Sequence, residues 1–108
     1  MKTVKVKLYW ENKTHDQLKK LLKSSKYSTI VKFDEDIDNW LKSAWSIVLN
    51  NLQEMQSIYD MLGEMRFLSP DAPMEKLSLG RQFELYEGSK CVAKGEIIEK
   101  ENSSESIT

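Results

Sequence analysis

Side chains suited to catalysis are scarce in this chain of 108 residues, which holds one histidine, His15, and one cysteine, Cys91. A Cys–His or Ser–His–Asp catalyst needs the imidazole within hydrogen-bond reach of the nucleophile. His15 stands beside Asp16 on the polar side of an expected short helix, so it would have to meet Cys91 across a long stretch of chain. One histidine and one cysteine are also too few for a zinc site. We therefore predict no catalytic residues, no metal and no cofactor, and we do not expect an enzyme.

Carboxylates are plentiful, and two of them could meet on one face of a sheet as a general acid and base. Charged residues make up 31% of the sequence, however, and solvated strands of such a chain bring carboxylates together routinely. We interpret them as surface residues, and Cys91 as a small, partly buried apolar side chain. The carboxylates in question are Glu64, Glu84, Glu87 and Glu96.

The densest acidic run is Asp34–Asp38, with the sequence DEDID. A calcium loop of this spacing needs a glycine at the bend and a closing glutamate, and neither stands at the required offset. We interpret the run as a solvated loop followed by an aromatic residue that could anchor a protein partner. The predicted partner-binding residues are Asp34, Glu35, Asp36, Asp38 and Trp40.

Four lysines cluster around the expected short helix and could form a patch that contacts phosphate or RNA. The chain as a whole has a net charge of −1 and a pI near 5.9, so no global positive field attracts nucleic acid. We prefer to interpret the cluster as a solvated helix face and disfavour nucleic acid as the partner. The four residues are Lys19, Lys20, Lys23 and Lys26.

Period-two patterns predict strands in the first third of the chain. Apolar and polar residues alternate over Thr3–Trp10, and the β-branched run Tyr27–Phe33 indicates a second strand. Between them, Thr14 is a good N-cap for a helix over His15–Leu22. The two prolines of Ser69–Pro73 predict a loop.

The segment Asn39–Met65 fits two structures. Apolar residues recur every three or four positions, which is typical of a helix. Against this, Ala44–Asn50 is a compact strand-like run, Asn50-Asn51 is a turn signal, and Ile58–Leu68 can form another strand.

The segment Leu77–Ile98 predicts a β-hairpin, because two apolar runs flank a turn at Glu87–Lys90. Together with Met65–Leu68 and the proline loop, it resembles the end of the C-terminal β-barrel of translation elongation factor Tu. That family closes its barrel with a strand ending in Glu-Gly, a tight turn, and a strand reading small–apolar–Gly–apolar. The matching residues here are Glu87, Gly88, Val92, Gly95 and Ile97.

The resemblance implies a barrel in which Ala44–Asn50 and Ile58–Leu68 are strands joined by a turn over Asn50–Ser57. The sequence departs from the family pattern at Tyr86, where the family has Arg, and at Ser89, where the family has a second turn Gly. The chain also has no Gly-rich phosphate-binding loop with Lys and Ser/Thr, so the resemblance implies no GTPase module.

We therefore predict one mainly β domain over residues 1–100, a small antiparallel closed barrel with a short N-terminal helix, and a disordered polar tail over residues 101–108. The alternative is an α+β fold with a helix at residues 39–65. Neither a signal peptide nor a membrane-spanning stretch is evident, so we expect a cytoplasmic protein without a membrane partner.

For function we expect a non-enzymatic module that binds a protein partner, such as a toxin-neutralising immunity protein. An RNA- or ribosome-associated accessory factor is the alternative, and a small-molecule-binding protein or enzyme ranks last.

Overall fold

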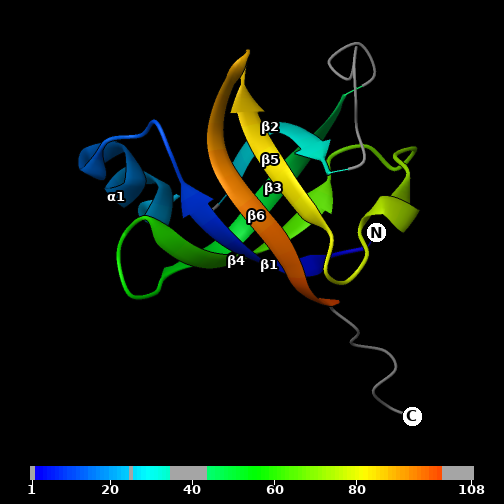
Figure 1. Ribbon diagram of the computed structural model, residues 1–108, viewed down its shortest axis with the longest axis horizontal. Coiled ribbons are helices and arrows are strands. Elements are labelled where there is room, and N and C mark those ends of the chain that lie inside the picture. Colours follow the sequence, from blue (N-terminus) through cyan, green and yellow to red (C-terminus); the bar gives the residue numbers. More distant parts are fainter. Residues whose placement is uncertain (1, 25, 35–43, 101–108) are drawn as a thin grey trace.

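The computed structural model describes residues 2–24, 26–34 and 44–100. Within these ranges the chain forms a closed antiparallel barrel with the strand order β1–β4–β3–β2–β5–β6, in which β6 pairs back to β1 (Figure 1). The elements are β1 (Val4–Trp10), α1 (His15–Lys23), β2 (Lys26–Phe33), β3 (Trp45–Glu54), β4 (Asp60–Phe67), the 3₁₀ helix η2 (Met74–Lys76), β5 (Gln82–Glu87) and β6 (Lys90–Lys100).

The predicted mainly β barrel with one short helix is confirmed, and the α+β alternative is wrong. Residues 45–54 and 60–65, which the helical alternative placed in one long helix, belong to the neighbouring strands β3 and β4. The first residues of that alternative, 39–43, and the predicted tail at 101–108 lie outside the described residues. No helix in the described part of the chain is long and apolar enough to cross a membrane.

Strand β1 shows how the sequence pattern builds the wall of the barrel. Its side chains alternate strictly between buried and exposed, with Val4, Val6, Leu8 and Trp10 on the inside. Both edges of β1 are paired, to β4 on one side and to β6 on the other. Strand β1 therefore has one buried and one solvent-exposed face, as predicted for Thr3–Trp10.

Helix α1 begins and ends close to the prediction. Thr14 caps it in a capping box, in which the Thr14 side chain accepts from the Gln17 amide while the Gln17 side chain accepts from the Thr14 amide. Leu18 and Leu21 are buried on its inner face. The helix packs against the barrel at β3.

The turn predicted at Asn50-Asn51 is wrong. Strand β3 continues to Glu54, and the chain reverses after it, where the Met55 amide donates to the Asp60 carbonyl at 2.9 Å. At Asn51 the register between β3 and β4 shifts, and the residue has a φ of 53°. Asparagine tolerates this left-handed conformation, so the same residue type that favours a turn here forms a β-bulge.

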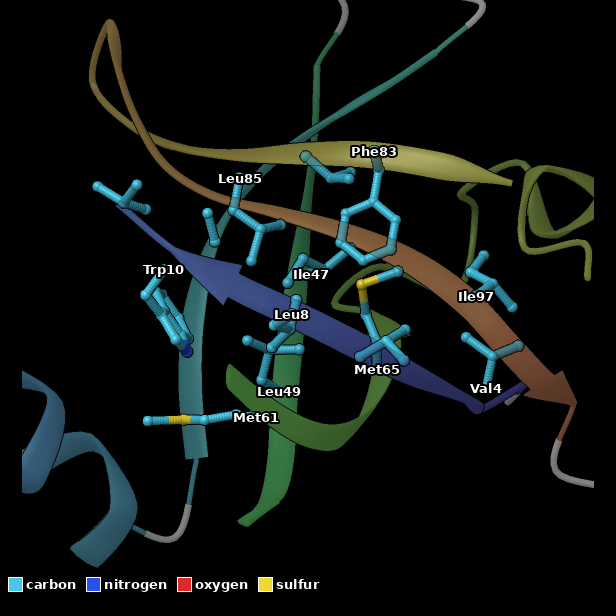
Figure 2. Packing of buried hydrophobic residues seen from close by; sticks show 14 of the residues in the cluster. Val4, Leu8, Trp10, Ile47, Leu49, Met61, Met65, Phe83, Leu85 and Ile97 are labelled. Carbon is cyan, nitrogen blue, oxygen red and sulfur yellow. The ribbon is translucent and has the colours of Figure 1, made fainter. Parts of the chain in front are cut away.

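The core fills the barrel with side chains from every strand. Figure 2 shows Leu8, Ile47, Met65 and Phe83 pointing toward one another from β1, β3, β4 and β5. Phe33 makes edge-to-face contacts with Phe67 and Phe83, with ring centroids 6.0 and 6.4 Å apart. These pairs are the geometry that aromatic quadrupoles prefer.

The β5–β6 hairpin carries two glycines with different roles. Gly88 sits in the two-residue turn of the predicted hairpin with a φ of 64°. The second glycine, Gly95, lies within β6. A Cβ there would lie only 2.5 Å from Phe83 Cζ and 2.9 Å from Leu8 Cδ2. The bare backbone thus lets β6 lie directly on the core, and Figure 1 shows the two strands curving strongly together.

Candidate functional site

A groove of about 570 Å³ opens on the described surface. It runs over four adjacent strands, β2, β5, β6 and β1, and reaches the start of β4 at Asp60. Its polar side chains occupy positions that alternate with core residues, so they point away from the barrel interior. They are Lys7, Tyr9, Lys32, Asp34, Asp60, Gln82, Glu84, Lys94 and Glu96.

Strand register arranges these side chains in rows that cross the groove. One row runs from Lys32 to Glu84 to Lys94, each directly opposite the next on a neighbouring strand, and continues to Tyr9 on β1. Unlike charges that lie directly opposite each other on neighbouring strands stabilise the pairing of those strands. The row therefore stabilises the wall and also gives the groove charges of both signs.

The second row runs from Gln82 to Glu96 to Lys7. Lys7 and Glu96 are register partners of opposite charge, yet within the described part of the chain neither forms an ion pair or a side-chain hydrogen bond. Tyr9, two residues along β1 from Lys7, is 52% exposed. The groove thus offers a cation, an anion and an aromatic side chain to a binding partner.

Two residues that line the groove form ion pairs with residues outside it. The Arg81 guanidinium lies 3.4 Å from the Asp34 carboxylate, and Lys94 Nζ lies 3.7 Å from Glu11. Near the rim, the Tyr86 hydroxyl donates to Glu84 at 2.9 Å. Burial, together with this bond to a carboxylate, raises the pKa of Tyr86 to about 12.

A second polar cluster, Lys13–Tyr27–Glu87, joins the loop after β1 to the tip of the β5–β6 hairpin. The Tyr27 hydroxyl donates to the Glu87 carboxylate, and Lys13 Nζ lies 2.8 Å from the same group. The bonds from Lys13 and Tyr27 hold the pKa of Glu87 below its ordinary value. Burial and the bond to Glu87 raise the pKa of Tyr27. The cluster braces the hairpin, and Asn12 adds a bond from Nδ2 to the Cys91 carbonyl at 2.8 Å.

Of the predicted partner-binding residues, the structure places only Asp34, and it lies on the rim of the groove. Glu35, Asp36, Asp38 and Trp40 lie outside the described residues. Sequence reasoning missed the rest of the groove, because its residues come from strands far apart in the chain. The available signal was the polar positions of the alternating strands.

The predicted phosphate or RNA patch is exposed throughout. Lys19, Lys20 and Lys23 lie on α1, and Lys26 begins β2. None of the four lines the groove.

The structure gives the candidate catalytic residues separate surroundings. His15 is exposed on α1, and among the described residues it has no hydrogen-bond or ion-pair partner. Cys91 is partly buried on β6, where burial raises the pKa of its thiol, which lowers the fraction of reactive thiolate.

The four carboxylates considered from sequence also have different surroundings in the structure. Glu64 accepts from Asn51 and Glu87 belongs to the brace with Lys13, whereas Glu84 and Glu96 both line the groove. Within residues 2–24, 26–34 and 44–100 there is no group of three or more His, Cys, Asp or Glu side chains placed to hold a metal ion.

Comparisons of the chain with protein-family models, with curated proteins and with solved structures find no match. Its function is therefore inferred from the geometry of the molecule itself.

Proposed function

We propose that this protein is a non-enzymatic protein-binding module whose contact surface is the groove over β2, β5, β6 and β1. The observation that carries the proposal is the adjacency of Lys7, Glu96 and the exposed ring of Tyr9 on one concave surface. Tyrosine is enriched among the residues that dominate binding energy at protein interfaces, and complementary charges set orientation and association rate.

The mixed sign of the groove's charges favours a protein partner over a nucleic acid. A phosphate backbone selects a surface of one sign, whereas Asp34, Glu84 and Glu96 would repel it here. Protein segments carry both signs and can satisfy both kinds of side chain at once. Asp34, one of the predicted partner-binding residues, lines this groove.

We also propose that the barrel resembles the C-terminal barrel of elongation factor Tu. This resemblance does not extend to GTP binding, because the chain has no phosphate-binding loop. We keep a toxin-neutralising immunity protein as one class of such a protein-binding module, working in the cytoplasm.

Site-specific photo-crosslinking in host cells tests the proposal. A photo-reactive phenylalanine analogue at Tyr9 is expected to form a discrete adduct with one protein, which mass spectrometry identifies. The same analogue at Lys23, outside the groove, is the matched control. Absence of an adduct specific to the Tyr9 position would contradict the proposal.

Binding measurements with the purified partner provide a second test. Lys7→Glu and Glu96→Lys are each expected to weaken binding about tenfold, or ~1.4 kcal/mol, because each replaces an attraction by a repulsion. Lys23→Glu, a change of equal charge outside the groove, is expected to leave the affinity unchanged. Equal effects of the groove and control variants would show that only net charge matters, against the proposal.

A further inference from the structure

Four exposed lysines outside the groove form a cluster of positive charge. They are Lys19, Lys20, Lys23 and Lys26, here named the α1 lysine surface. All four side chains are exposed. Within the described residues none of them forms an ion pair or a hydrogen bond through its side chain. Residues 15–26 contain these four lysines and a single acidic residue, Asp16, although the net charge of the whole chain is −1.

Helical spacing creates both unlike and like pairs among these charges. Asp16 stands three residues before Lys19 and four before Lys20, which favours the helix. Lys19 and Lys23 stand four residues apart and Lys20 and Lys23 three apart, and like charges at these spacings destabilise a helix by about 0.2–0.5 kcal/mol per pair. The helix dipole offsets this for Lys20 and Lys23, which lie in the last turn. It offers little to Lys19 or to Lys26, which begins β2. Lys23 has no acidic residue three or four positions away, and the lysines at those spacings are Lys19, Lys20 and Lys26.

From this arrangement we infer that the α1 lysine surface binds the phosphate backbone of RNA, independently of the groove and of its proposed protein partner. Helix α1 is held on the barrel, because Thr14 caps its start and Leu18 and Leu21 on its inner face are part of the core. The lysines therefore project from a fixed support.

An anionic membrane fits this surface less well than RNA does. A helix that lies in a membrane interface inserts an apolar face, and here that face is occupied, with Leu18 fully buried and Leu21 only 9% exposed. An acidic protein also fits less well. Lysine is depleted in the cores of protein interfaces, and the exposed large apolar residues of the described chain lie on other elements.

The contacts expected are to phosphates and not to bases. No exposed large aromatic residue lies on α1, so the surface has nothing on which a base could stack. Binding is therefore expected to be independent of sequence and strongly dependent on salt.

Fluorescence anisotropy of the full chain with a labelled oligouridine of about 16 nucleotides tests the inference. Four phosphate contacts predict that log K falls with log salt with a slope of about −2.8. Raising salt from about 50 to about 200 mM would then weaken binding about fiftyfold. Lys19→Gln/Lys23→Gln should reduce that loss to about sevenfold, since two contacts are removed. Lys19→Arg/Lys23→Arg should retain binding.

The matched control is Lys90→Gln/Lys100→Gln, which removes the same net charge from exposed positions on β6 outside both surfaces. Its oligouridine affinity is expected to equal that of the wild type. Three results would overturn the inference: no binding of oligouridine at about 50 mM salt, equal weakening by the two double glutamine variants, or lysine-dependent binding to phosphatidylserine vesicles in place of oligouridine. Circular dichroism of each variant verifies that the fold is unchanged.

Discussion

At the scale of single residues, Gly95 decides how closely β6 approaches the core. Gly95→Ala is expected to lower the free energy of unfolding by about 1–3 kcal/mol, because its Cβ would collide with the buried ring of Phe83. Urea unfolding measures the change. Gly63→Ala is the control, since the nearest atom there, at 2.7 Å, is the end of the flexible Leu52 side chain. Adding Phe83→Leu to Gly95→Ala should recover part of the loss, and no recovery would contradict the steric explanation.

Glu87 makes stability depend on pH. Lys13 and Tyr27 hold its pKa in the folded protein below the ordinary value of 4.5. Its contribution is therefore fully present above that pH and is lost as pH falls through the folded pKa. Glu87→Gln should lower the free energy of unfolding at pH 7, and the difference from wild type should shrink below pH 4.5. Urea unfolding across this range is the measurement.

The matched control for Glu87 is Glu54→Gln. Glu54 is exposed at the end of β3, and in the described part of the chain it has no hydrogen-bond or ion-pair partner. Its difference from wild type should stay near zero at every pH. A Glu87→Gln effect that is as large at pH 3 as at pH 7 would refute the ionic explanation.

At the scale of elements, α1 depends on its N-terminal cap. Thr14→Ala removes the acceptor for the Gln17 amide and is expected to destabilise the protein by about 1 kcal/mol. Thr14→Ser keeps the acceptor and should behave as wild type. Both values come from urea unfolding, with oligouridine binding measured in parallel, since a frayed α1 would no longer hold the lysine surface in place.

At the scale of the whole molecule, closure of the barrel predicts how the protein opens. Each of the six described strands is paired on both sides, so none can detach without breaking two ladders. Helix α1 packs on the barrel mainly at β3. Native-state hydrogen exchange should therefore show one shared, high free energy of opening for the strands and a lower one for α1. Equal protection of α1 and the strands would show that the helix belongs to the same cooperative unit.

Local features of this protein are determined by its sequence. The alternation of β1, the Thr14 cap of α1 and the turn at Gly88 each depend on neighbouring residues, and all three were predictable. The segment around Asn51 was not, because asparagine in a left-handed conformation serves equally in a turn and in a bulge. Which of them forms depends on the pairing of β3 with β4.

Only the tertiary structure decided the groove. Lys7, Lys32, Glu84 and Glu96 are separated widely along the chain and become neighbours because β2, β5, β6 and β1 are adjacent in the closed barrel. Sequence periodicity shows that these residues face outward, but it carries no information on which strands lie side by side. Strand order is set by contacts between distant segments, and that is why the acidic run was visible in the sequence while the groove beside Asp34 was not.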